Sequence, residues 1–287
     1  MDRLNITVAG IRSPILRAGA ASSPDAVVFI HGNPGSSTDW TDLLEQVAPF
    51  SRAIAFDMPG FGQAQKPASF DYTVAGYAHH LGLILEQEQV ERVHLVLHDF
   101  GGPWGLAWAA QNVGRVLSVT LFNIGVMPGY RWHYMARIWR TPLLGEMAMA
   151  TTTRAALKLS LRVGNPRGLH DAYVDEMYAN FDAGTRRAVL KLYRATGDVG
   201  AMGERLAAVL QRRRLPALVV WGARDPYVPV RFAEVQREYF AVDRVVMLDD
   251  SGHWPMIDNP QAVREAVVPF LRAQVANGAR GPAAASQ

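Results

Sequence analysis

The sequence predicts an α/β domain with a mostly parallel, eight-stranded sheet, helices on both faces of the sheet and a helical cap inserted near its middle. Short apolar runs alternate with segments of helical periodicity before residue 127 and after residue 214, which is the pattern of βαβ units. The stretch between them, residues 127–214, has helical patterns only and is rich in Trp, Tyr, Met and Arg. A sheet domain interrupted by a helical cap is the simplest organisation that fits both observations.

The expected strands are short and apolar, as strands buried in a parallel sheet usually are. They cover residues 3–9, 13–19, 26–30, 52–56, 93–97, 116–122, 217–221 and 244–248. Helical spacing of apolar positions predicts helices over residues 38–47, 73–88, 230–238 and 260–275, and another that ends near residue 111. The expected division is a core domain of residues 1–126 and 215–275, a cap of residues 127–214, and a disordered Gly-, Ala- and Pro-rich tail of residues 276–287.

Composition narrows the classes of function. The net charge is only +3, and we interpret the densest basic run, residues 212–214, as a solvated helix end and expect no nucleic acid partner. The absence of cysteine excludes disulfides, thiolate nucleophiles and cysteine-ligated metals, and no histidine spacing indicates a metal site, so we expect no cofactor. The N-terminus has no apolar signal core and no apolar run is long enough for a membrane helix, which predicts a cytoplasmic protein without membrane contact.

Three reactive side chains follow expected strands, at the edge where open α/β sheets bind ligands. Asp99 follows the strand over residues 93–97, Asp225 follows the strand over 217–221, and His253 comes after the last strand. A single Asp after a strand is usually a helix cap or turn residue. A carboxylate, a second carboxylate and a histidine at three strand ends instead indicate a catalytic group of nucleophile, acid and base.

The motifs around these residues resemble those of the α/β-hydrolase superfamily over nearly the whole chain. That family places its nucleophile on a sharp strand-to-helix turn, usually Gly-x-nucleophile-x-Gly, and this chain has Leu-His-Asp-Phe-Gly at residues 97–101. The missing serine argues against a serine esterase. The His-Asp pair, the His-Gly-Asn-Pro loop at 31–34 and the Asp-Met-Pro-Gly-Phe-Gly turn at 57–62 are similar to the branch that contains epoxide hydrolases and haloalkane dehalogenases.

The resemblance implies a mechanism with a covalent ester. The carboxylate of Asp99 is ionised at neutral pH and can attack a saturated carbon without a base. His253 would then activate water to hydrolyse the ester, and Asp225 would orient the imidazole and stabilise the imidazolium. The backbone N–H groups of Asn33 and Phe100 would form the oxyanion hole.

An epoxide hydrolase must also protonate the departing alkoxide, and cap tyrosines do this in that family. Tyr193 lies late in the expected cap, about where the second tyrosine of the family belongs, although it also fits the core face of an amphipathic helix. Tyr134 and Tyr130 are the candidates for its partner.

A haloalkane dehalogenase instead needs N–H donors that hold the halide, commonly an Asn in the loop at 31–34 and a Trp directly after the nucleophile. Asn33 fits this role, but the phenyl ring of Phe100 has no N–H group. Trp104, Trp132 or Trp139 could replace it, although Trp104 also fits ordinary helix packing.

We therefore expect an epoxide hydrolase that converts a small apolar epoxide and water to a diol. Haloalkane dehalogenase is the alternative. A non-catalytic receptor for a small apolar ligand on the same fold is a third hypothesis, because a fold does not determine activity.

Overall fold

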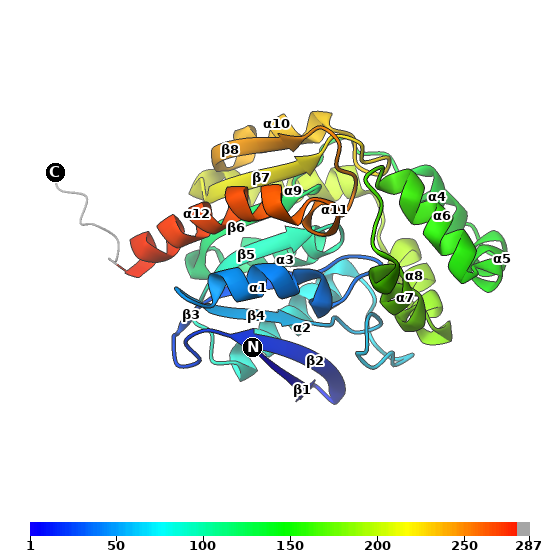
Figure 1. The fold of residues 1–287 in the computed structure, drawn as a ribbon, viewed down its shortest axis with the longest axis horizontal. Helices are drawn as coiled ribbons and strands as arrows, with labels where there is room; N and C mark the ends of the chain where they lie inside the picture. Colours follow the sequence, from blue (N-terminus) through cyan, green and yellow to red (C-terminus); the bar gives the residue numbers. More distant parts are fainter. Residues whose placement is uncertain (280–287) are drawn as a thin grey trace.

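An eight-stranded sheet forms the centre of the computed structural model, which describes residues 1–279 (Figure 1). The strands are β1 (Asp2–Val8), β2 (Ile11–Ala18), β3 (Asp25–Ile30), β4 (Arg52–Phe56), β5 (Arg92–His98), β6 (Val116–Phe122), β7 (Pro216–Gly222) and β8 (Ala241–Leu248). Their order across the sheet is β1-β2-β4-β3-β5-β6-β7-β8. β2 is antiparallel to both β1 and β4, and the pairs from β4 to β8 are parallel. The predicted fold class is confirmed.

The central strands bury both faces of the sheet. Successive side chains of a strand point to opposite faces, so a strand with helices on both sides must be apolar throughout. In β3, Val28 and Ile30 pack into one core cluster, whereas Val27 and Phe29 pack into the other. This explains why the strands appear in the sequence as continuous apolar runs.

Two sets of helices supply the other half of these clusters. The remaining elements of the sheet domain are η1 (Ser37–Trp40), α1 (Thr41–Val47), α2 (Val74–Gln87), α3 (Gly101–Gln111), η2 (Val113–Arg115), α10 (Arg231–Tyr239), α11 (Pro255–Asp258) and α12 (Pro260–Ala279). Side chains of α1 and α12 join Val27 on one face, and those of α2, α3 and α10 join Val28 on the other. α12 continues past residue 275, so residues 276–279 of the expected tail are helical, and residues 280–287 lie outside the described residues.

The segment between β6 and β7, which we call the insertion (residues 123–215), is built from helices. They are α4 (Tyr134–Arg140), α5 (Leu144–Thr151), α6 (Arg154–Gly164), α7 (Asp171–Asn180), α8 (Ala183–Ala195) and α9 (Val199–Arg213). Figure 1 shows α4 to α8 together at one end of the sheet. α9, in contrast, packs against α3 and α10 in the helical layer of the sheet domain. The division into core and cap at residues 127 and 214 stays a prediction.

Helix ends in the insertion are specified by local capping. Thr153, Asp182 and Asp198 precede α6, α8 and α9, and each side chain accepts a hydrogen bond from the backbone N–H three residues further on. These caps satisfy N–H groups that have no partner within the helix. No helix within residues 1–279 combines the length and apolar character needed to span a membrane.

Two hydrogen bonds that involve the carboxyl groups of Asp39 and Glu176 connect η1 to α7 of the insertion. The hydroxyl of Tyr173 on α7 donates to Asp39 Oδ1 at 3.0 Å, and Thr38 Oγ1 donates to Glu176 at 2.9 Å. Burial, with the nearby carboxylates of Asp57 and Glu176, outweighs the hydrogen bonds that Asp39 accepts from Tyr173 and from the backbone N–H of Ser36, and raises the pKa of Asp39 to about 8. The folded protein therefore retains a proton at neutral pH that an unfolded chain would release.

We predict that this carboxyl group makes the protein less stable as pH rises. Because the folded pKa of Asp39 lies above its ordinary value of 3.8, the folded state binds more protons than the unfolded state between about pH 4 and pH 8, and stability falls across that window. Asp39→Asn should reduce this loss. Urea unfolding of both proteins at pH 5 and pH 8 measures it, and an equal loss in the variant would contradict the assignment.

Candidate active site

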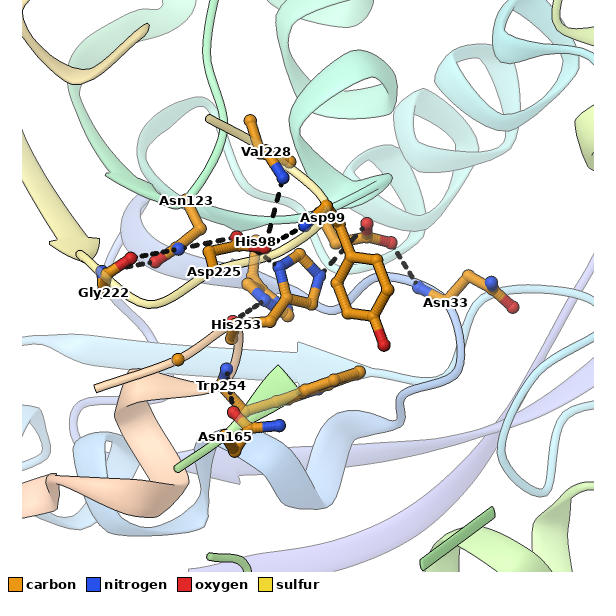
Figure 2. Close-up of polar contacts among 12 residues, drawn as sticks. Asn33, His98, Asp99, Asn123, Asn165, Gly222, Asp225, Val228, His253 and Trp254 are labelled. Atoms are coloured by element: carbon orange, nitrogen blue, oxygen red, sulfur yellow. Dashed lines mark hydrogen bonds and ion pairs between the residues drawn. The ribbon is translucent and has the colours of Figure 1, made fainter. Parts of the chain in front are cut away.

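The three residues singled out at strand ends come together at one edge of the sheet. Asp99 follows β5, Asp225 follows β7 and His253 follows β8, and Figure 2 shows their side chains in line. Parallel strands end at the same edge, so residues far apart in the sequence meet there. His253 Nδ1 lies 2.7 Å from Asp225 Oδ2, and His253 Nε2 lies 3.4 Å from Asp99 Oδ2.

Asp99 is held on a tight turn between β5 and α3. Its φ of +47° lies in the left-handed region, which non-glycine residues rarely adopt. A Cβ on Gly32 would lie 2.3 Å from Asp99 Cβ, and a Cβ on Gly101 would lie 2.3 Å from the carbonyl oxygen of Ile30. Only glycine therefore fits at both positions. The turn presents the Asp99 carboxylate to the cavity described below, with 14% of the side chain exposed.

Asn33 contacts the Asp99 carboxylate through its backbone. The N–H group of Asn33 donates to Asp99 Oδ1 at 2.7 Å. Phe100, the other residue expected in the oxyanion hole, directly follows Asp99 at the start of α3. A donor already in contact with the carboxylate needs little rearrangement to bind an oxyanion that forms at the same oxygen.

Asp225 is fixed by three further donors. The backbone N–H groups of Tyr227 and Val228 donate to its Oδ1 at 2.7 and 3.1 Å, and Asn123 Nδ2 donates to Oδ2 at 2.7 Å. With the carboxylate held in this way, Nδ1–H of His253 donates to it, and Nε2 faces Asp99. Asn123, directly after β6, is a site residue that sequence analysis missed.

The charges of the two carboxylates dominate the electrostatics of His253. Burial lowers the pKa of His253, but Asp225 and Asp99 outweigh burial and raise this pKa well above its ordinary value. For Asp99 the effects have the opposite sign. Burial raises its pKa, but the hydrogen bond and positive charge of His253 outweigh burial and lower this pKa. The Asp99 carboxylate is therefore ionised at neutral pH and paired with the imidazolium of His253.

A cavity of about 420 Å³ opens onto Asp99 and His253 and is bounded mainly by the insertion. Its walls are mostly apolar side chains of α4, α5, α6 and α8, among them Met135, Trp139, Met149, Leu157, Leu161, Val189 and Tyr193. A second cavity, of about 30 Å³, lies against Phe100 and Trp132. Four side chains line both cavities: Asp99, His133, Tyr193 and Tyr227.

The three tyrosines proposed as acids have different surroundings. Tyr193 on α8 is buried, and its hydroxyl accepts a hydrogen bond from Asn33 Nδ2 at 3.3 Å, which leaves its own proton available to another acceptor. The Tyr130 hydroxyl already donates to the carbonyl oxygen of Tyr227 at 3.0 Å. Tyr134 is 46% exposed in the wall of the larger cavity. Burial and the charge of Asp99 raise the pKa of Tyr193 well above its usual value, so it stays protonated.

The three tryptophans proposed as halide donors also differ. Trp104 is not in the wall of either cavity within the described chain, because it is fully buried and stacked on Tyr77 with ring centroids 4.2 Å apart. Trp132 lines the small cavity, but its indole N–H donates to the carbonyl oxygen of Gly197 at 3.3 Å. Trp139 lines the larger cavity. Of the three, Trp139 remains as a candidate donor.

His133 is a further polar residue at the junction of the cavities. Its Nδ1 accepts a hydrogen bond from the backbone N–H of Ala136 at 3.3 Å, so Nε2 carries the proton of the neutral ring. Burial lowers the pKa of His133 to about 4, which keeps the ring neutral. The only sequence signal was its place in the expected cap. No group of three residues suited to bind a metal ion is found within residues 1–279.

Comparisons with known proteins agree with this architecture. A family model described as alpha/beta hydrolase fold matches residues 25–260. A haloalkane dehalogenase of Mesorhizobium japonicum is 28% identical, over 88% of this chain and 86% of that protein. A cis-3-alkyl-4-alkyloxetan-2-one decarboxylase of Shewanella oneidensis is 27% identical, over 86% of this chain and 82% of that protein. The crystal structure of haloalkane dehalogenase DbeA from Bradyrhizobium elkani superposes with a TM-score of 0.82 at 23% identity, covering 96% of this chain and 99% of that one.

Proposed function

The chain belongs to the alpha/beta hydrolase fold family, and we propose that it is an epoxide hydrolase that opens small apolar epoxides through a covalent ester on Asp99. The observation that carries the proposal is the buried hydroxyl of Tyr193. It lines the same cavities as Asp99, and its hydrogen bond from Asn33 leaves its proton available. An epoxide oxygen departs as a strongly basic alkoxide, and a nearby phenol can protonate it.

In the first step a carboxylate oxygen of Asp99 attacks an epoxide carbon. The C–O bond of the ring breaks, and the departing oxygen takes its proton from Tyr193 while the neutral N–H of His133 donates a second hydrogen bond. The ester carries no charge on Asp99. The attraction that raised the pKa of His253 is therefore weakened, which favours release of its proton to solvent water and makes it a base.

In the second step His253 takes a proton from water, and the resulting hydroxide attacks the ester carbonyl. The N–H groups of Asn33 and Phe100 stabilise the oxyanion, and Asp225 stabilises the imidazolium. Collapse releases the diol, whose oxygen takes the proton from His253. The carboxylic acid left on Asp99 passes its proton to His253, which restores the ion pair. The Tyr193 phenolate takes up from solvent water the equivalent of the proton that His253 released after the first step.

Tyr193→Phe is expected to lower kcat/KM for epoxides by about 10²-fold or more, because the alkoxide loses its acid. Ester formation from a bromoalkane should be unaffected, since bromide leaves without a proton. Gas chromatography of epoxide loss, with Tyr178→Phe on α7 as a matched control outside both cavities, measures the effect. Full epoxide turnover by Tyr193→Phe would rule out this tyrosine as the acid.

A haloalkane dehalogenase is the second candidate. It is supported by the similarity to the Mesorhizobium japonicum dehalogenase and by Trp139 in the wall of the larger cavity. Against it, the side-chain amide of Asn33 is directed to Tyr193, and Phe100 occupies the position after the nucleophile. Halide release from a panel of bromoalkanes distinguishes the two. Alkyl oxetan-2-ones should be assayed separately, by loss of substrate, because one relative is named for that substrate.

A further inference from the structure

The loop that carries His253 is attached to the insertion as well as to the sheet. The backbone N–H of His253 donates to the carbonyl oxygen of Gly164 at 3.0 Å, and the N–H of Trp254 donates to Asn165 Oδ1 at 2.9 Å. Figure 2 shows Asn165 beside Trp254, below the imidazole of His253. Both acceptors come from the end of α6, about 90 residues earlier in the sequence.

The side-chain amide of Asn165, at the contact between α6 and the His253 loop, forms a hydrogen bond through both its nitrogen and its oxygen. The residue is completely buried, and its Nδ2 donates to the carbonyl oxygen of Leu161 at 2.9 Å while its Oδ1 accepts from Trp254. The loop itself passes very close to α6, since a Cβ on Gly252 would lie 1.9 Å from the carbonyl oxygen of Gly164. A buried amide with its donor and acceptor both satisfied has one stable orientation.

The sheet side of the same loop is fixed separately. His98 Nε2 donates to the carbonyl oxygen of His253 at 2.7 Å, and Asp225 accepts from the imidazole. Burial, with the positive charge of His253, lowers the pKa of His98 to about 3, so this ring is neutral. Because Nε2 donates to the carbonyl oxygen of His253, Nε2 carries the single ring proton and Nδ1 is unprotonated. The base is thus held between the sheet and α6.

α6 also forms part of the substrate cavity. Leu157, Ser160 and Leu161 line it together with Asp99 and His253. Leu161 therefore faces the cavity and provides the carbonyl oxygen that orients Asn165. The helix that would contact the substrate is the helix that supports the catalytic base.

From these contacts we infer that Asn165 is a positioning residue that sets the orientation of His253 for hydrolysis of the ester. The inference rests on the proposed two-step mechanism. Asp99 needs no base to form the ester, whereas the ester carbonyl is attacked only by water that His253 activates. Loss of Asn165 should thus slow the second step and leave the first step unchanged.

Two variants and one control test this role. Asn165→Ala removes the two hydrogen bonds of the side-chain amide, to the carbonyl oxygen of Leu161 and from the N–H of Trp254. Asn165→Asp keeps an acceptor for the N–H of Trp254. Asn112→Ala is the matched control, because Asn112 ends α3 and also donates from Nδ2 to the carbonyl oxygen four residues earlier, at 2.9 Å, but lies away from the His253 loop. The three proteins and wild type are compared in steady-state epoxide hydrolysis, by intact mass after quenching, and by thermal melting.

Asn165→Ala should lower kcat and KM together by about tenfold or more, with kcat/KM preserved, because a small misplacement of a catalytic group is costly. The quenched sample should contain the ester on Asp99. Asn165→Asp should restore part of kcat, and Asn112→Ala should behave as wild type in catalysis. A fall in kcat at unchanged KM, with no ester, would mean only a loss of folded enzyme and would overturn the inference. If His253→Ala itself forms no ester with any substrate, the proposed function fails instead.

Discussion

Asp99→Ala is expected to abolish turnover, with a loss of about 10⁴-fold or more in kcat. Every step of the proposed reaction passes through an ester on this carboxylate, and no other carboxylate lines both cavities in the described part of the chain. The measurement is product formation from epoxides and bromoalkanes at high enzyme concentration. Substantial turnover by the variant would contradict a covalent mechanism.

The fold of the variant must be verified, because Asp99 occupies a strained turn. Alanine at a φ of +47° retains that strain but loses the hydrogen bond from Asn33, so circular dichroism and thermal melting should accompany the assay. Asp99→Asn keeps the shape of the side chain and should lose the nucleophile as well. A folded but inactive asparagine variant separates chemistry from structure.

His253→Ala is expected to form the ester but not to hydrolyse it, so that turnover falls by about 10³-fold or more while one equivalent of substrate is consumed. The carboxylate attacks without a base, and water without His253 is too weak a nucleophile for the ester carbonyl. Intact mass after incubation measures the adduct, and peptide mapping should place it on Asp99. His79→Ala, which replaces an exposed histidine, is the matched control and should turn over normally.

The mass of the trapped adduct also identifies the leaving group. A gain equal to the whole epoxide indicates ring opening, and a gain equal to the alkyl group without bromine indicates dehalogenation. The double variant Asp99→Ala/His253→Ala should gain neither. Absence of any adduct in His253→Ala would favour the third hypothesis, a receptor for small apolar ligands.

The sheet and the meeting of Asp99, Asp225 and His253 could be predicted because both are encoded locally. A buried parallel strand is a short apolar run, and a residue that follows such a run within a few positions lies near the ligand-binding edge. The motif around Asp99 also contains Gly101, and the structure explains this glycine by a contact that leaves no room for a Cβ. These signals need no knowledge of how distant helices pack.

The surroundings of the site could not be predicted in this way. Trp104 and Tyr193 both occupy helical positions with apolar spacing, yet one is stacked in the core and the other lines the cavities. His133 and Asn165 acquire their surroundings from the packing of the insertion against the sheet domain, which depends on long-range contacts. The same holds for α9, whose sequence resembles the other helices of the insertion but which packs beside α3.

The most direct test of the account is a single turnover of an epoxide in H₂¹⁸O with enzyme in excess. An ester on Asp99 predicts that the first diol carries no ¹⁸O, because its new oxygen comes from the carboxylate, and that ¹⁸O appears in the peptide containing Asp99. A diol labelled with ¹⁸O in the first turnover, with an unlabelled Asp99, would show direct attack by water and would contradict the covalent mechanism.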